Sequence, residues 1–266
     1  MPKVKDIISI LQDFSPEQYI YDYDNVGLML GSPDADVTKV LCCLDVTTEV
    51  VNEAIEMEAQ LIISHHPLIF TPLKELTTTN NLGDKIIKLI KNDISVYSAH
   101  TNLDFVSGGI NDYVAKLFGL VDISPIDSYI SNSEGFGRIG TLINPITANK
   151  LGEIVKQKLD DRLVSVIGYT NNVIYKVAVI NGSGGGDVSI VDKAIKLGAN
   201  ALITGEVKHH VAIYAKENNF NIIEMQHYTS ERIYVFELVK ILQNLAIERN
   251  VEVEIFAANK EVNPRN

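Results

Sequence analysis

Helical and strand-like spacings of apolar residues alternate along the first 120 residues of the chain. Residues 4–14 (VKDIISILQDF) carry apolar side chains at helical spacing, and this pattern stops near Ser15 and Pro16. Short apolar runs typical of buried strands and further helical patterns then follow in turn. The strands are expected at 39–46, 60–64 and 94–100, and the helices at 47–59, 83–93 and 109–120. This alternation predicts an α/β layer fold with a largely parallel sheet.

A second run of the same kind begins after a polar stretch at 124–138, which suggests a domain boundary. Its strands are expected at 175–182, 201–205 and 220–226, before a long amphipathic helix at 230–249 and a final strand at 251–256. The two runs are similar in sequence: AIEMEAQLIIS (54–64) aligns without a gap on AIKLGANALIT (194–204).

We therefore predict two related α/β domains from an internal duplication, with mixed, mostly parallel sheets. The first domain is expected to comprise residues 1–125 with 222–266, and the second residues 126–221.

Composition and charge indicate which classes of protein the chain could belong to. Hydrophobic residues make up 46% of the 266 positions, which is enough for a substantial core. The 23 basic and 34 acidic residues give a net charge of −11, which repels nucleic-acid backbones and favours cations. Cys42 and Cys43 are expected to be two small buried thiols in a reducing compartment. Without a signal peptide or a run of ~20 apolar residues, we expect a soluble cytoplasmic protein with no membrane or nucleic-acid partner.

Histidines and carboxylates follow three of the predicted strands. His65 and His66 end the first, His100 and Asp104 follow the second, and His227 and Glu231 follow the third. Ligands of parallel α/β sheets bind beyond the carboxyl ends of the strands. Imidazole nitrogen with carboxylate oxygen is a ligand mixture favoured by Zn²⁺, Fe²⁺ and Mn²⁺. Adjacent histidines diverge from an extended backbone, so two neighbouring metal ions could take one each.

Structural roles remain as alternatives for these residues. Asp104 could cap a helix, and Glu231 could be a first-turn carboxylate that the helix dipole favours. His209 and His210 fit either the rim of a site or an ordinary helix surface. The glycine-rich segment at 182–186 lacks the dinucleotide and P-loop fingerprints, so a plain turn and an anion cradle both remain open.

The chain resembles the Nif-three-like family over essentially its whole length. The resemblance is carried by six motifs in the family's order: YDNVGLMLG, LDVT, SHHPLIF, AHTNLD, ITGEVKHH and QHYTSE. Its bacterial members are often labelled GTP cyclohydrolase 1 type 2. The resemblance implies two α/β domains, a hexameric ring and a dinuclear metal centre. It implies His66 and Asp104 on one metal ion, His65 and His227 on the other, and Glu231 bridging them. His100 would stand beside the centre or carry a proton, whereas the role of Glu206, where an Asp is common, is less defined.

The implied activity is metal-assisted hydrolysis, with ring opening of GTP and release of formate as the named reaction. A phosphoesterase or amidohydrolase acting on another small molecule is the nearest alternative. A metal-binding adaptor or regulatory protein without turnover is the alternative from another class. The expected cofactors are two divalent ions (Zn, Fe or Mn), and the expected partners are a small-molecule substrate and further copies of the chain.

Overall fold

The computed structural model describes residues 1–131 and 133–265, which group into two compact units. Unit 1 is Met1–Leu103 with Val235–Asn266, and unit 2 is Asp104–Tyr234. The chain passes from one unit to the other inside helices α4 (Thr101–Phe105) and α9 (His227–Glu248). The sequence pattern places the divisions at 125/126 and 221/222 instead. These sequence-based divisions stay a prediction.

Unit 1 contains a five-stranded sheet in the order β1-β4-β3-β2-β13. The pairs β4–β3, β3–β2 and β2–β13 are parallel, and β1 joins the edge antiparallel to β4. The strands are β1 (Gly27–Leu30), β2 (Lys39–Cys43), β3 (Leu61–Ser64), β4 (Ser95–Ser98) and β13 (Glu254–Ala257).

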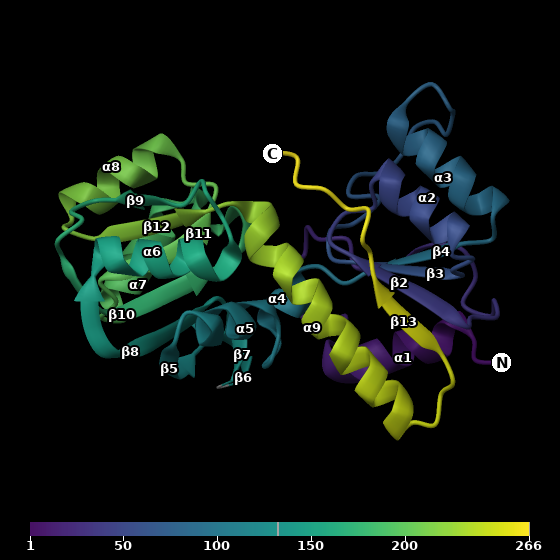
Figure 1. Cartoon of the computed structure of the whole chain (residues 1–266), viewed down its shortest axis with the longest axis horizontal. Helices are drawn as coiled ribbons and strands as arrows, with labels where there is room; N and C mark the ends of the chain where they lie inside the picture. The colour runs from purple at the N-terminus through teal and green to yellow at the C-terminus, as the bar shows by residue number, and fades with distance from the viewer. Residues whose placement is uncertain (132, 266) are drawn as a thin grey trace. The chain divides into compact units, whose positions relative to one another are not determined.

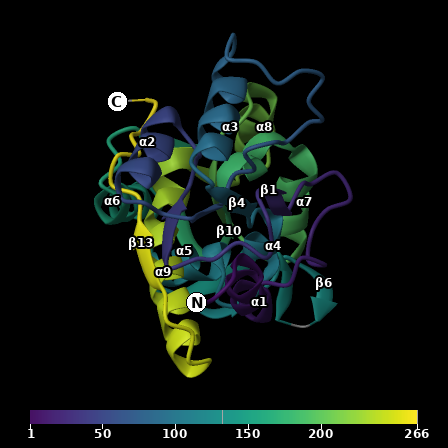
Figure 2. The same cartoon turned by 90° about the vertical axis from the view of Figure 1, so that its right-hand side faces the viewer.

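Helices cover both faces of this sheet (Figures 1 and 2). On one face lie α2 (Thr48–Glu56) and α3 (Asn81–Lys91), and on the other lie α1 (Val4–Phe14) and the later part of α9. Thr47 and Asn80 cap α2 and α3 by accepting backbone N–H groups with their side chains, which fixes where each helix begins after its strand or loop.

Unit 2 contains a six-stranded sheet in the order β5-β8-β10-β11-β12-β9. Its centre, β10-β11-β12, is parallel, and the outer strands are antiparallel. The strands are β5 (Leu120–Ser124), β8 (Arg138–Thr147), β9 (Ser165–Ile167), β10 (Val173–Ile180), β11 (Ala201–Gly205) and β12 (Asn221–Met225). A separate pair, β6 (Asp127–Ser131) with β7 (Glu134–Phe136), lies within the polar stretch that suggested a boundary.

Alternate residues of β10 face the two helical layers of unit 2. Val177 and Val179 pack with α5 (Ile110–Leu117) and α6 (Ala148–Leu159). Ala178 and Ile180 pack with α7 (Val188–Lys196) and α8 (His209–Glu217). This two-residue period is what a strand buried on both faces requires.

Equivalent side chains make the same contacts in the two units. In unit 1, Lys39 Nζ donates to the carbonyl of Met57 at 3.1 Å, and the backbone N–H of Lys39 donates to Gln60 Oε1 at 3.0 Å. At the aligned positions of unit 2, Lys176 Nζ donates to the carbonyl of Leu197 at 2.8 Å, and the Lys176 N–H donates to Asn200 Oδ1 at 3.2 Å. The α-to-β connections are therefore closed by the same hydrogen bonds, which supports the duplication inferred from sequence.

The predicted α/β class is confirmed by this architecture. Cys42 and Cys43 are both buried in β2, as expected, and burial raises the pKa of Cys42 to about 12. Within the described part of the chain, none of the helices has the length and apolar character needed to cross a bilayer.

Candidate metal centre

Three histidines come together at the carboxyl ends of β3 and β4 in unit 1. Each offers a ring nitrogen, and these three nitrogens lie within 4.8 Å of one another. The ring centroids are 5.1 Å apart for His65 and His66, and 5.2 Å apart for His65 and His100. The proximity follows from the sheet, because Ser64 and Ser98 pair in register and the histidines continue their two strands. His65 is buried, and His66 is partly exposed.

The Nδ1 atom of each of these rings lies at hydrogen-bond distance from an acceptor. The contacts are His65 Nδ1 with the carbonyl of Ala99 at 2.9 Å, His66 Nδ1 with Asp45 Oδ1 at 2.8 Å, and His100 Nδ1 with Asp24 Oδ1 at 2.7 Å. Because each acceptor holds the proton on Nδ1, the lone pair of the neutral ring is on Nε2. Metal-ligating histidines in proteins are usually oriented in this way.

Asp24 is a carboxylate held in its charged form. Burial opposes its ionisation, but hydrogen bonds from His100 and from the side chain of Thr101 outweigh that penalty and lower the pKa of Asp24 to about 2. The Thr101 backbone N–H also donates to Asp24 at 3.1 Å. A fixed negative charge therefore stands behind His100 at neutral pH.

Unit 2 has its own histidine and carboxylate, one turn apart near the start of α9. His227 Nε2 lies 2.8 Å from Glu231 Oε2, and His227 Nδ1 lies 2.9 Å from Glu206 Oε1. Glu231 is buried, with only 3% of its surface exposed. The orientation of His227 thus matches that of the unit 1 histidines, with a carboxylate on Nδ1 and Nε2 directed to a further ligand-type group.

The glycine-rich segment adjoins this pair. Residues Gly182–Gly186 form a short 3-10 helix after β10, and Gly182 has a φ of +62°. A Cβ on Gly182 would lie 2.5 Å from Glu231 Oε1 and 3.3 Å from His227 Nε2. Glycine suits this position, because it adopts a positive φ without strain and because a Cβ would displace the end of the Glu231 side chain.

Asp161 fixes the backbone from which His227 projects. Its carboxylate accepts hydrogen bonds from the Gln226 N–H at 2.8 Å, from Gln226 Nε2 at 2.6 Å and from the Thr229 hydroxyl at 2.9 Å. Asp161 is almost fully buried, yet these bonds outweigh desolvation and keep the pKa of its carboxyl below the usual value. The junction between β12 and α9 is held by this one side chain.

The remaining candidate residues are Asp104, His209 and His210. Asp104 is half-buried in α4, and its main-chain carbonyl accepts a hydrogen bond from Asn111 Nδ2 at 3.1 Å. Its role as a metal ligand stays a prediction. His209 and His210 are exposed in the first turn of α8, which agrees with the helix-surface alternative.

The sequence pattern assigns no role to Asp24, Asp45 or Asp161. Asp45 carries a usable signal, because it lies two residues beyond the carboxyl end of the buried strand β2, where ligands of parallel sheets bind. Asp161 carries none, since it lies in a connection more than sixty residues from Gln226.

The sequence is similar to known proteins over nearly its whole length. A family model described as Duf34/NIF3 (NGG1p interacting factor 3) matches residues 2–264. A Clostridium perfringens protein named "GTP cyclohydrolase 1 type 2 homolog" is 39% identical, with 98% of each chain covered. A Drosophila melanogaster protein named "NIF3-like protein 1" is 30% identical over 98% of this chain and 88% of its own.

Solved structures show the same architecture. The crystal structure of a Bacillus cereus protein related to NIF3 superposes with a TM-score of 0.92 at 26% identity, covering 99% of this chain and 98% of that one. HcgD from Methanocaldococcus jannaschii gives a TM-score of 0.81 at 28% identity, with 97% and 98% covered.

Proposed function

Because the chain belongs to the Duf34/NIF3 family, we propose that it is a metal-dependent hydrolase with two divalent ions per subunit. Its proposed reaction is the ring opening of GTP with release of formate, in line with the name of its bacterial relatives. The observation that carries the proposal is the common orientation of four histidines, each with Nδ1 against an acceptor.

The proposed ligands follow the family resemblance. His66 and Asp104 would hold one ion, His65 and His227 the other, and Glu231 would be shared. The donor set suits a first-row ion such as Zn²⁺, Fe²⁺ or Mn²⁺, because it combines neutral imidazoles with carboxylates. Asp45 and Glu206 would keep His66 and His227 in the required tautomer.

When bound, such ions supply Lewis acidity that lowers the pKa of water. The protein's own contribution would be orientation and proton handling. His100 is suited to carry a proton, since the ionised carboxylate of Asp24 on Nδ1 stabilises the imidazolium that forms when Nε2 accepts one. We place His100 in this role rather than among the ligands.

Metal content tests the proposal first. Protein purified without added metal or chelator should contain about two metal equivalents per chain, and Glu231→Ala should lose most of them. His209→Ala is the matched control, because His209 is exposed in α8 and outside the proposed ligand set. A wild type that holds no metal and takes up no added Zn²⁺, Mn²⁺ or Fe²⁺ would overturn the proposal.

Turnover separates the enzyme from its main alternative. Formate release from GTP that is abolished in Glu231→Ala supports the hydrolase, and a panel of phosphoesters and amides tests the other substrates. The family description as an interacting factor favours a second candidate, a metal-binding adaptor without turnover. Two bound metal ions with no product from any substrate would favour that adaptor. We also propose that the chain forms a homohexamer and that it is located in the cytoplasm. Light scattering, which measures the mass of the assembly, tests the hexamer.

A further inference from the structure

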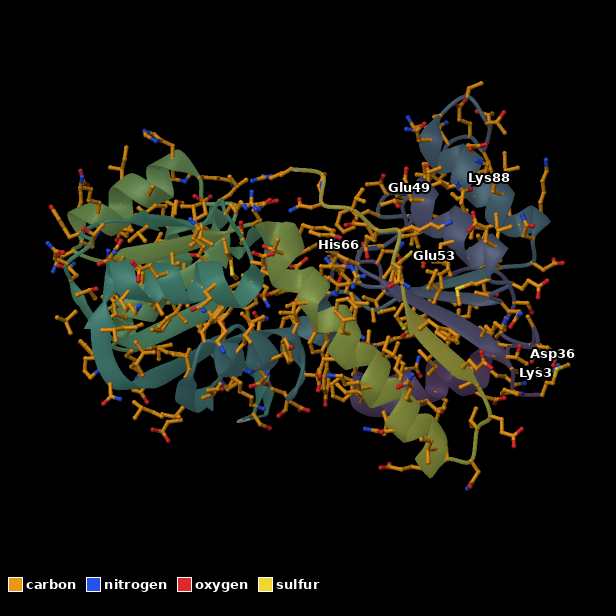
Figure 3. The ribbon with its side chains drawn as sticks, viewed as in Figure 1. Lys3, Asp36, Glu49, Glu53, His66 and Lys88 are labelled. Carbon is orange, nitrogen blue, oxygen red and sulfur yellow. The ribbon has the colours of Figure 1, made fainter. Side chains whose placement is uncertain are left out.

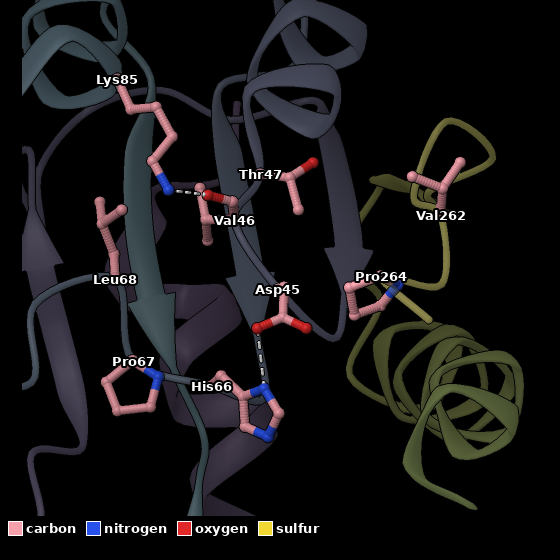
Figure 4. A pocket seen from close by; sticks show the side chains of 9 residues that line it. All are labelled: Asp45, Val46, Thr47, His66, Pro67, Leu68, Lys85, Val262 and Pro264. Atoms are coloured by element: carbon pink, nitrogen blue, oxygen red, sulfur yellow. Dashed lines mark hydrogen bonds and ion pairs between the residues drawn. The ribbon is translucent and has the colours of Figure 1, made fainter. Parts of the chain in front are cut away.

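A cavity of about 340 Å³ in unit 1 adjoins His66 (Figure 4). It lies where β2 ends and where the chain leaves β3, and its polar lining consists of Asp45, Thr47, His66 and Lys85. Leu68 and Val262 contribute apolar surface. Small-molecule sites typically have this size and this mixture of apolar wall and few polar groups.

Lys85 is the cation of this cavity. It is half-buried on α3, and its ammonium donates to the carbonyl of Val46 at 2.6 Å (Figure 4). Within the described residues, no carboxylate forms an ion pair with Lys85 at 4.0 Å or less. Its neighbour Lys88 on the same helix is instead paired with Asp84 at 2.9 Å. A half-buried ammonium has three donors, and the one contact with Val46 leaves capacity for a ligand.

Burial and nearby carboxylates act on the charge of Lys85 in opposite directions. Burial lowers the pKa of Lys85, and the carboxylates of Asp45 and Glu49 act in the opposite direction. Thr47 caps α2 at the cavity wall, and Glu49 in the first turn of that helix offsets the positive end of its dipole. Of the two carboxylates, Asp45 lines the cavity and contacts His66 Nδ1, so a divalent ion on that ring would offset its charge.

We propose that this cavity binds the phosphate group of a small phosphorylated substrate and that Lys85 recognises it. The inference rests on the proposed function, since His66 lines the cavity and is also a proposed metal ligand. A molecule that places its phosphate on Lys85 would then contact the ring that holds the ion. Lys85 is a specificity residue in this scheme and takes no part in bond breaking.

Direct binding tests this role without relying on turnover. Inorganic pyrophosphate is titrated calorimetrically into Mn²⁺-loaded wild type, Lys85→Met, Lys85→Gln, Lys85→Arg and Lys88→Met, with metal content measured on each sample. Loss of a charge-assisted hydrogen bond should weaken binding about tenfold or more in Lys85→Met and Lys85→Gln. Lys85→Arg retains a cation and should remain within about threefold of wild type. Lys88, which is labelled in Figure 3, lies on the same helix, and Lys88→Met should bind pyrophosphate with the affinity of wild type.

The outcomes separate this inference from the metal proposal. Equal affinity of wild type and both neutral Lys85 variants, with metal retained, overturns the phosphate site and leaves the metal centre standing. No binding by the wild type also overturns the site. A metal-free wild type that binds pyrophosphate through Lys85 supports the site and overturns the hydrolase. Thermal unfolding is followed for each variant. If Lys85→Met proves unstable, the conclusion is drawn from Lys85→Gln, which keeps a donor for the Val46 carbonyl.

Discussion

The carboxylate of Asp45 lies 2.8 Å from Nδ1 of His66, which joins the end of β2 to the residue that carries the proposed metal. Replacing Asp45 by Ala removes the acceptor that fixes the ring. Metal affinity should then fall about 10- to 100-fold, as for other acceptors behind a ligating histidine. Competition with a chelator of known affinity measures the change. Asp36→Ala is the control, because Asp36 is exposed and pairs with Lys3 on the surface (Figure 3). An unchanged affinity in Asp45→Ala would contradict the assignment.

Asp161 should make the stability of unit 2 depend on pH. Its pKa is lowered in the fold, so its contribution is fully present above the unfolded value near 3.8 and is lost as the pH falls below it. In Asp161→Asn, an amide replaces an acceptor of several hydrogen bonds, and the free energy of unfolding at pH 7 should fall by about 2–3 kcal/mol. Urea unfolding at pH 7 and pH 3 measures both effects. The difference between wild type and variant should shrink at the lower pH, and a constant difference would argue against the carboxylate.

Arg138 and Asp112 form a buried ion pair at 2.8 Å in unit 2. The guanidinium also donates to four main-chain carbonyls, those of Phe105, Val106, Gly135 and Gly137. Arg138→Met leaves a buried carboxylate without its cation, so stability should fall by about 3–5 kcal/mol.

The exposed pair of Lys193 and Asp127 provides the comparison for Arg138. Lys193→Met should cost less than about 1 kcal/mol, because solvent screens a surface pair. Chemical unfolding of both variants gives the two values. Equal losses would mean that burial does not set the strength of the Arg138 contacts.

Substitutions at two glycines with positive φ distinguish the cost of backbone strain from the cost of a steric clash. Gly198 has a φ of +83° and nothing within 4 Å of the position that a Cβ would take, whereas Gly182 faces Glu231 and His227. Gly198→Ala should therefore cost only the left-handed conformation, about 1–2 kcal/mol. Gly182→Ala should cost more in unfolding free energy and should also lower metal content, because Glu231 must move. Retained metal in Gly182→Ala would show that Glu231 tolerates displacement.

Strong local patterns explain what the sequence could predict. β2, β3 and β11 are short apolar runs buried on both faces, and α3 begins at an Asn cap, so their types follow from local chemistry. The strand β8 was missed because it contains Gly140 and Pro145, and much of its length is exposed. The predicted elements also omit α6, although its sequence has a readable signal, with Thr147 as cap and apolar residues at helical spacing.

In the candidate site, too, the sequence could predict some residues and not others. Histidines at strand ends could be found because the chemistry is rare and the position is local. The residues that orient them could not, because each comes from a distant segment: Asp24 lies before β1, and Glu206 follows β11. Such pairings depend on which strands become neighbours, and apolar spacing does not encode that choice.

The order of synthesis gives the position of β13 a consequence for the nascent chain. β2 is made early, but its parallel partner β13 appears only after the whole of unit 2. During translation unit 2 can close its sheet while β2 still presents an open edge of backbone N–H and C=O groups. The histidine-bearing sheet is therefore the later of the two to mature, and it is the part of the newborn protein that most needs protection from aggregation.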